Sequence, residues 1–475
     1  MITRLKVHGF KNLLDVDLRL GPFTCIAGAN AVGKSNLFDA ITFLSLLADK
    51  PLHEAALRVR SEGQRSSDLR DIFFHHAAGF LDTMDFEVEM IIPNHGFDDL
   101  RQPVEASITS LRYHLTLKYR EKDGLIELVR EDLMPIPLRE ARSEIGFPAT
   151  KAWKDSAIHG RKSSPFISTD FTSSAGATIK LHQDKVQGGT LNRLAYTVPK
   201  TILSTVDTNQ YPTALLVRNE MRSWKLLQLE TSSLRKSDEF HQITNASISS
   251  TGENMAATVF RIQKESEEDI YQQLSNRVTK LLDAPVNIEV DKDEKRELVT
   301  LQMSTQGGAV FPARSLSDGT LRLLGLAVVD MDHRSGSVIC LEEPENGIHP
   351  GKIEQVLDLL QEMPTDTEYP LDNDNPLRQV IINTHSPIVV QNVNHESLLV
   401  AEVKSRALDK TAVVATHFSP LPNTWRSKSQ PEVKPVLLGK LLSYLGDPTG
   451  ALIHSVQPGK RVKDREDITA QIPIW

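Results

Sequence analysis

One short segment, residues 28–35, constrains the fold of this chain more than any other part of the sequence. It reads Gly-Ala-Asn-Ala-Val-Gly-Lys-Ser and fits G-x-x-x-x-G-K-[ST], with an apolar run at 23–27 before it and a helical pattern at 36–47 after it. Backbone N–H groups of such a loop cradle phosphates, and the dipole of the following helix adds to the attraction. We expect Lys34 to bridge the outer phosphates of a nucleotide and the Ser35 hydroxyl to bind Mg²⁺.

A second motif lies far along the chain and supplies acidic groups. Residues 338–341 (Val-Ile-Cys-Leu) form a buried-strand pattern that ends in Glu342 and Glu343. One carboxylate of such a pair can hold a metal ion while its neighbour activates water. We expect Glu343 to orient the attacking water and Glu342 to act at the metal, either directly or through a water molecule. The two motifs in this order favour nucleotide hydrolysis.

Two further segments agree with this interpretation. Ser317 precedes a helical run at 321–329, and Gly319 lies beside it, so the turn presents free N–H groups to an anion. An apolar strand pattern at 380–384 ends in His385. Taken singly, Ser317 is more simply a helix cap and His385 a packed histidine. The fixed order of all four motifs favours the functional interpretation.

The four motifs together resemble those of ABC ATPases. Residues 315–320 (Ser-Leu-Ser-Asp-Gly-Thr) resemble the signature loop, the acidic pair resembles the Walker B motif, and His385 resembles the switch histidine. In ABC ATPases the signature loop binds the γ-phosphate that is held by the opposite protomer. The resemblance therefore implies a dimer with ATP sandwiched between two copies, in which Ser317 and Gly319 act on the nucleotide of the partner.

A finer resemblance is to the RecF/SMC-like branch, and within it to the overcoming-lysogenisation-defect (OLD) type of ATP-binding proteins. It is carried by residues 2–12, 33–41, 250–257 and 342–350. It covers residues 1–135 and 245–400. The implied nucleotide contacts are Lys11, Gly28, Asn30, Gly33, Lys34, Ser35, Asn36, Ser317 and Gly319, with Glu343 and His385 catalytic and Ser35 and Glu342 at Mg²⁺. Gln64 is the only glutamine between the phosphate loop and Gln102, and no switch glutamine can be assigned from the sequence.

The expected fold class is α/β, an ABC-ATPase (P-loop NTPase) head with a mixed central sheet, an antiparallel β-layer and a mixed insert. Alternating polar and apolar residues at 85–90 and 111–119 predict the antiparallel layer. No sustained heptads occur in the looser stretch that follows, so any projecting arm is short. The expected division is an N-terminal ATPase lobe (1–135), an insert (136–244), a C-terminal ATPase lobe (245–400) and an extension (401–475).

Composition limits the class of protein. The 475 residues are 40% apolar and 24% charged, as in soluble globular proteins, and the apolar runs fall short of the ~20 residues that cross a bilayer. With no signal-peptide pattern, we expect a cytoplasmic protein with no membrane contact. The net charge of −8 argues against whole-surface binding of nucleic acid but not against a local patch. Basic runs at 218–225, 235–236 and 460–465 are candidate patches, although a solvated face explains each more simply.

Three functional hypotheses follow. The first is the sensor ATPase of a prokaryotic genome-defence system that controls a separate effector, such as a nuclease or a toxin-like protein. It rests on the resemblance and on the absence of a D-x-D pattern after His385, which indicates no nuclease of the Toprim type in this chain. The second is a RecF-like repair ATPase that clamps double-stranded DNA. The third, a transporter nucleotide-binding subunit, fits the insert and the acidic extension poorly. We expect slow hydrolysis in a dimer or higher oligomer.

Overall fold

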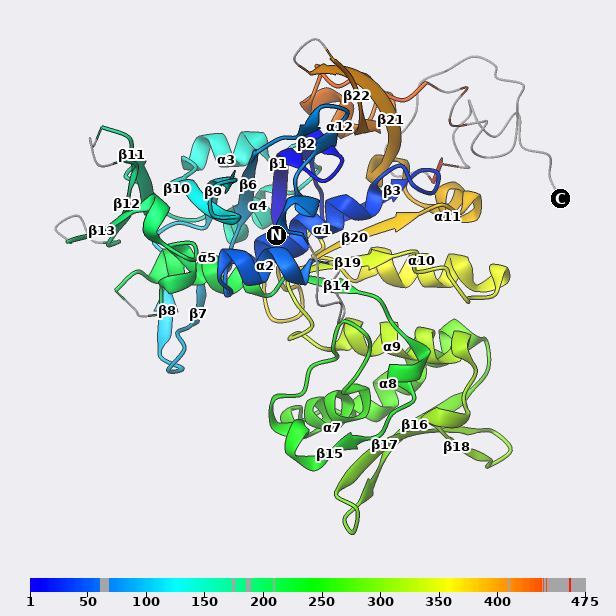
Figure 1. The fold of residues 1–475 in the computed structure, drawn as a ribbon. Coiled ribbons are helices and arrows are strands. Elements are labelled where there is room, and N and C mark those ends of the chain that lie inside the picture. The colour runs from blue at the N-terminus through cyan, green and yellow to red at the C-terminus, as the bar shows by residue number, and fades with distance from the viewer. Residues whose placement is uncertain are drawn as a thin grey trace.

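The chain folds around two large sheets (Figure 1). The computed structural model describes residues 1–59, 68–172, 176–184, 189–207, 210–408, 411–437, 439, 441 and 461–462. One sheet is antiparallel and eight-stranded, and the other is six-stranded and mostly parallel. Mixed α/β architecture with large antiparallel and mixed sheets is the fold class that the sequence predicted, and that prediction is confirmed.

The eight-stranded sheet forms the antiparallel layer. Its strands, in spatial order, are β13 (Thr190–Leu194), β12 (Thr178–His182), β11 (Ile167–Asp170), β10 (Leu125–Pro135), β9 (Ser110–Arg120), β6 (Thr83–Ile91), β1 (Ile2–Phe10) and β2 (Leu13–Arg19). In β1 and β9 buried and partly exposed residues alternate, which is the period-2 pattern of a sheet with one face on the core. The predicted strands at 85–90 and 111–119 are β6 and β9.

The six-stranded sheet positions the candidate site. Its order is β14 (Lys225–Leu227), β19 (Val338–Glu342), β20 (Gln379–Thr384), β3 (Phe23–Ala27), β21 (Leu398–Leu408) and β22 (Thr411–Pro420). The first five strands are parallel, and β22 returns antiparallel to β21. Every residue of β3 and β20 is buried, as expected for parallel strands covered on both faces. Helix α1 (Lys34–Leu47) follows β3, and α11 (Pro387–Asn392) follows β20.

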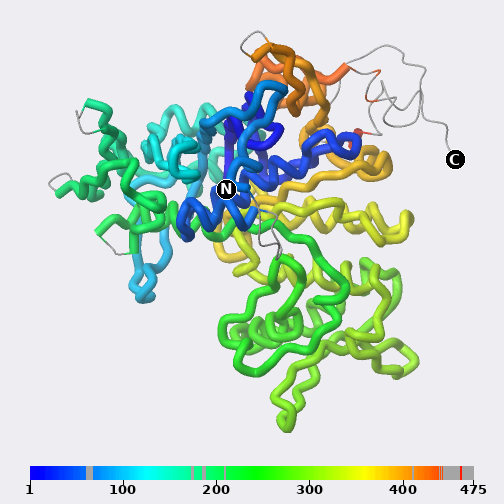
Figure 2. Tube along the Cα trace, viewed as in Figure 1, coloured from blue at the N-terminus to red at the C-terminus, as the bar shows by residue number. Residues whose placement is uncertain are grey.

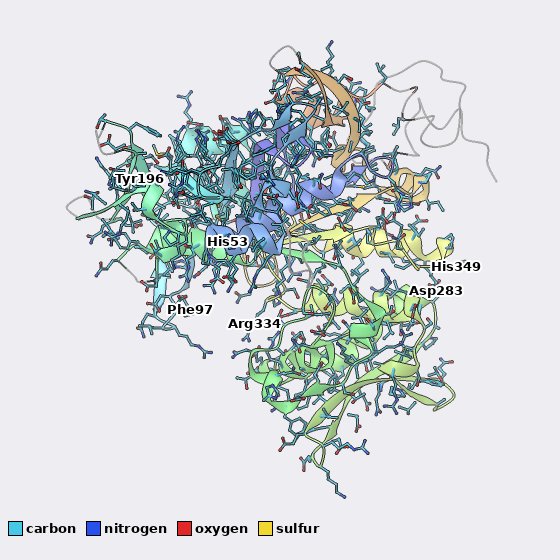
Figure 3. The ribbon with its side chains drawn as sticks, in the orientation of Figure 1. His53, Phe97, Tyr196, Asp283, Arg334 and His349 are labelled. Atoms are coloured by element: carbon cyan, nitrogen blue, oxygen red, sulfur yellow. The ribbon has the colours of Figure 1, made fainter. Side chains whose placement is uncertain are left out.

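A second lobe lies below the parallel sheet in Figure 1. It contains β15 (Asp238–Glu239), β16 (Val286–Asp293), β17 (Leu298–Thr305), β18 (Val310–Pro312), α6 (Thr231–Leu234), α7 (Met255–Glu265), α8 (Ile270–Leu282) and α9 (Asp318–Met331). Helix α10 (Ile353–Glu362) lies between this lobe and the sheet. Figure 3 labels Asp283 and His349 at the junction, where Lys352 forms an ion pair with Asp283. Buried side chains of the lobe and of the parallel sheet form one hydrophobic cluster.

Smaller elements complete the chain. They are α2 (Leu52–Arg58), α3 (Leu138–Glu144), α4 (Lys151–Ala157), α5 (Pro212–Arg222), α12 (Trp425–Ser429), and the short strand pairs β4 (His75–His76) with β5 (Gly79–Phe80) and β7 (His95–Phe97) with β8 (Pro103–Glu105). Residues 136–244, the predicted insert, add β11–β13 to the antiparallel sheet and β14 to the parallel sheet. The four-part division of the chain stays a prediction. None of the helices in the described ranges has the length and apolar character needed to cross a bilayer.

Other residue patterns in the sequence agree with the structure to different degrees. Strand patterns at 397–402 and 411–415 form the hairpin β21–β22, and the strand pattern at 286–290 forms β16. The apolar spacing over 266–283 favours a single helix, but the helix begins only at Ile270, because Asp269 caps it and α7 ends before it. Most of a helical pattern at 437–445 lies outside the described residues, and so does Gln64.

Two members of the candidate basic patch at 218–225, Arg218 and Trp224, are not on the surface. Arg218 is 7% exposed, donates to the Val206 carbonyl and pairs with Asp99, and Trp224 is 4% exposed. The helical period of α5 points Arg218 into the core, and Trp224, just after the helix, is buried there as well, whereas Arg222 is exposed. In the second run Arg235 pairs with Asp318. In the last run only Arg461 and Val462 are described, and Arg461 pairs with Glu354.

Glu131 on β10 makes the stability of the antiparallel layer depend on pH. The side chain is fully buried and accepts hydrogen bonds from the Ile202 N–H (2.6 Å), the Leu203 N–H (2.8 Å) and the Tyr113 hydroxyl (3.1 Å). Burial outweighs these donors and raises the pKa of Glu131 to about 7. The protonated side chain therefore favours the folded state. This stabilisation is complete below the unfolded pKa near 4.5 and is lost as the pH rises to about 7, which lowers the free energy of unfolding by roughly 3 kcal/mol.

Glu131→Gln removes this titration but keeps the shape of the side chain. We expect the variant to be less stable than the natural chain at pH 5, because an amide has only one acceptor oxygen for three donors. The deficit should shrink as the pH rises to 8. Urea unfolding of both chains from pH 5 to pH 8 measures the difference. A deficit that stays constant or grows with pH contradicts the raised pKa.

Candidate nucleotide-binding site

The phosphate loop links β3 to α1 in a conformation that its glycines permit. Ala31 has φ 64° and Gly33 has φ 95°, both in the left-handed region. A Cβ on Gly33 would lie 2.0 Å from Asn12 Nδ2 and 2.3 Å from Thr416 Oγ1, so only glycine fits there. The loop borders a hollow of about 300 Å³ lined by Asn12, Asn30, Ala31, Gly33, Lys34, Ser35, Asn36 and Glu343.

Lys34 lies at the first residue of α1 and is 6% exposed. Its Nζ donates to the carbonyls of Gly28 (2.7 Å) and Ala29 (2.9 Å). Burial lowers the pKa of Lys34, and the nearby carboxylates, led by Glu343, oppose that shift. The ammonium is thus held by two neutral acceptors, which an anionic phosphate can replace with a stronger, charge-assisted bond.

Glu342 and Glu343 lie where β19 ends, beside the carboxyl ends of β20 and β3. Glu343 has φ 45°, and its N–H donates to both the backbone and the side-chain oxygen of Asn383 (3.0 Å each). A left-handed backbone costs a residue with a Cβ about 1 kcal/mol, so it persists only where neighbours fix it. Here Asn383 fixes it and turns the Glu343 side chain toward the phosphate-loop hollow.

Both oxygens of the Glu343 carboxylate are oriented by neighbours. His385 Nδ1 lies 2.8 Å from Oε1, and Asn346 Nδ2 donates to Oε2 at 2.7 Å. The next acidic residue, Glu345, accepts from Thr384, whose hydroxyl also accepts from the Ser386 N–H (2.9 Å). The acidic turn and the histidine loop are therefore bonded together at Thr384 and at His385.

A second hollow of about 380 Å³ adjoins the first. It is lined by Ser35, Gln228, Leu229, Glu230, Arg322, Glu342, Glu343, Asn346 and Asn383, so the two hollows share Ser35 and Glu343. The Ser35 hydroxyl and the Glu342 carboxylate are hard oxygen donors of the kind that Mg²⁺ prefers. In the part of the chain that the structure describes, no cluster of three or more His, Cys, Asp or Glu side chains forms a metal site.

Two site residues were missed in the sequence. Gln228 follows β14, and its Nε2 donates to Glu342 Oε2 at 2.9 Å. A glutamine in this place is expected soon after the phosphate loop, whereas β14 and Gln228 lie inside the predicted insert (136–244). Asn12 lines the first hollow and accepts from Asn36 Nδ2 at 2.7 Å. The predicted contact, Lys11, instead pairs with the buried Asp39 at 2.8 Å.

The signature segment lies at the start of α9. Ser317 caps the helix by accepting from the Thr320 N–H (3.2 Å), and Arg235 pairs with Asp318 (2.6 Å). Ser317 is exposed, and neither it nor Gly319 lines the two hollows. Arg322, one turn further along α9, does line the second hollow, and it makes no ion pair with any residue in the described ranges.

One protein family matches a central part of the chain. Residues 198–391 match the family described as "AAA domain, putative AbiEii toxin, Type IV TA system". The matched span holds the signature segment, the acidic pair and His385. A search of curated proteins found no match. The match supports the predicted resemblance to ABC-type ATPases of the RecF/SMC-like branch, and the phosphate loop between β3 and α1 lies outside the matched span.

Solved structures of SMC heads are distantly similar. The Smc head bound to the C-winged helix domain of ScpA has 14% sequence identity and a TM-score of 0.47, covering 88% of this chain and 98% of that one. The Pyrococcus furiosus Smc head with an extended coiled coil is bound to the C-terminal domain of ScpA. It has 13% sequence identity and a TM-score of 0.39, covering 88% of this chain and 96% of that one. The SMC head domain from Thermotoga maritima has 14% sequence identity and a TM-score of 0.37, covering 88% of this chain and 98% of that one.

Proposed function

We propose that this chain binds and hydrolyses ATP and that two copies dimerise when ATP is bound. The observation that carries the proposal is that Lys34, Ser35 and Glu343 line one hollow, with His385 bonded to Glu343. Phosphoryl transfer to water needs positioning and charge neutralisation more than covalent chemistry, and this set of residues supplies both.

Each residue has a part in the proposed reaction. The loop N–H groups and Lys34 hold the phosphates, and Glu343, held by His385 and Asn346, orients the attacking water and accepts its proton. Ser35 and Glu342 would hold Mg²⁺, which when bound neutralises phosphate charge. Gln228 is bonded to Glu342 and lies beside the same hollow, so we propose that it senses the metal-bound state.

The dimer is proposed because the signature segment lies outside the hollows of its own chain. Ser317 and Gly319 are placed at an exposed helix N-terminus, where free N–H groups attract an anion. A second copy would bring this helix end onto the γ-phosphate bound to Lys34. Arg322 lies on the same helix and offers a further positive charge near the acidic pair.

Gly319→Asp tests whether the signature segment acts on the partner. The new carboxylate would face the γ-phosphate of the other copy, and partial solvent screening leaves a repulsion of about 1–2 kcal/mol. We expect ATP binding to the single chain to be unchanged, while ATP-dependent dimerisation and hydrolysis fall about tenfold. Nucleotide titration and ATPase assays of the same sample measure both.

Mixing Gly319→Asp with Lys34→Ala sharpens this test. A mixed dimer keeps one site in which an intact Lys34 faces an intact signature segment, so partial recovery of hydrolysis is expected. Normal hydrolysis by Gly319→Asp as a strict single chain contradicts the two-copy mechanism.

We propose a biological role as the ATPase of a prokaryotic genome-defence system with a separate effector protein. The matched family is described with a toxin of a toxin–antitoxin system, which supports this role over DNA repair. The burial of Arg218 and Trp224 takes two of its four side chains out of one candidate DNA patch, Arg218, Arg222, Trp224 and Lys225. A pull-down from the native host, with the natural chain and with Glu343→Gln, tests the role. Retention of a nuclease or toxin-like protein supports it, and retention of repair proteins contradicts it.

A further inference from the structure

The C-terminal hairpin β21–β22 packs directly on the phosphate loop. It lies outside residues 198–391, the span of the family match. Strand β21 pairs in parallel with β3, with Val400 opposite Ala27, immediately before the loop. A Cβ on Gly28 would lie 2.6 Å from the Ala401 carbonyl oxygen, so the hairpin backbone touches the first loop residue. Figure 2 shows the hairpin, in orange, beside the N-terminal strands, in blue.

Thr416 on β22 makes the most specific of these contacts. Its hydroxyl donates to the Val32 carbonyl at 2.7 Å, and its N–H donates to the Asn12 carbonyl at 3.1 Å. The residue is 2% exposed, so water does not compete for either bond. One residue of the hairpin is therefore hydrogen-bonded to both the phosphate loop and the turn between β1 and β2.

The bond to Val32 fixes the direction of the Gly33 N–H, and Gly33 lines the nucleotide hollow. The peptide unit between Val32 and Gly33 is planar and trans, so its C=O and its N–H point in opposite directions. When Thr416 holds the C=O on the side of the hairpin, the N–H of Gly33 is directed away from the hairpin. Loop residues with positive φ lack the repeating bonds of a helix, and this peptide needs an outside partner to keep its direction.

We propose that Thr416 is a positioning residue for nucleotide phosphates and that the hairpin is part of the nucleotide site. Its hydroxyl fixes the Val32–Gly33 peptide before the nucleotide arrives, so that binding does not have to order it. The proposal rests on the proposed function, because it takes the bound ligand to be the phosphates of ATP or ADP.

The test compares variants of Thr416 with a matched loss on the same strand. Thr416→Val and Thr416→Ala remove the hydroxyl, and Thr416→Ser keeps it. Ser419→Ala removes another buried hydroxyl of β22, one with no hydrogen-bond partner among the described residues. For each chain, Kd for ADP and for ATP, kcat at saturating ATP and the melting temperature are measured.

We expect Thr416→Val and Thr416→Ala to weaken ADP and ATP binding about tenfold, the effect of one net hydrogen bond, with kcat at saturation within about twofold. Thr416→Ser and Ser419→Ala should bind like the natural chain. The Ala variant decides the matter if the Val variant does not fold.

Three outcomes overturn the inference. They are unchanged binding in the variants that lack the hydroxyl, equal weakening in Thr416→Ser, and equal weakening in Ser419→Ala. A natural chain that binds neither ATP nor ADP instead defeats the proposed function itself. The two failures are therefore distinguishable.

Discussion

Lys34→Ala should abolish ATP binding, with affinity falling 100-fold or more. Lys34 is 6% exposed, and among the described residues its ammonium donates only to the carbonyls of Gly28 and Ala29. It is the loop's one cationic side chain, and charge-assisted bonds to a phosphate are worth roughly 1.5–3 kcal/mol each. Without it, the phosphates would face the three carboxylates that surround Lys34 with no countercharge. Calorimetric or fluorescence titration with ATP measures the loss.

Lys162→Ala is a matched control for this substitution. The Lys162 ammonium also donates to two backbone carbonyls, those of Gln183 (3.4 Å) and Asp184 (3.0 Å), and burial also lowers its pKa. It lines a different hollow, so its loss should leave ATP affinity unchanged. Unchanged ATP affinity in Lys34→Ala would remove the assignment of residues 28–35 as a phosphate loop.

Glu343→Gln should lower turnover by ~10²-fold or more while ATP stays bound, the effect of losing a general base. The amide keeps the shape of the side chain and can still contact His385 and Asn346. It cannot accept a proton from water, so the phosphates stay in place while hydrolysis stops. Single-turnover hydrolysis, measured with ATP affinity on the same sample, separates chemistry from binding.

Glu294→Gln controls for the loss of one negative charge. Glu294 is an exposed residue that pairs with Lys292 in the distant lobe, so its loss should leave turnover unchanged. Normal turnover in Glu343→Gln would show that Glu343 is not the base and would turn attention to Glu342 and His385.

Local sequence predicted the parts of the site that are themselves local. The phosphate loop, the acidic pair and His385 each follow a buried strand of one parallel sheet, and the carboxyl ends of such strands meet at one edge. Strand patterns then place Lys34, Glu343 and His385 together without knowledge of the rest. The antiparallel layer was predictable for a similar reason, since polar and apolar residues alternate along β6 and β9.

Long-range contacts were not predictable in this way. Thr416 bonds to Val32 across 384 positions, and Gln228 bonds to Glu342 across 114. A threonine in a β-strand and a glutamine after a three-residue strand carry no local signal for their partners. Arg218 shows the opposite error, in which a local pattern suggests a surface that does not exist. A run of basic residues does not show which side of its helix is covered, and Arg218 is buried.

ATP-dependent dimerisation tests the account most directly. The mass of Glu343→Gln is measured by light scattering in saturating ATP with Mg²⁺ and then in ADP with Mg²⁺, with bound nucleotide quantified in each sample. The account predicts twice the chain mass of 53.0 kDa in ATP and a single chain in ADP. It also predicts a single chain in ATP when Gly319→Asp is added. A single-chain mass for Glu343→Gln with ATP bound would contradict the account.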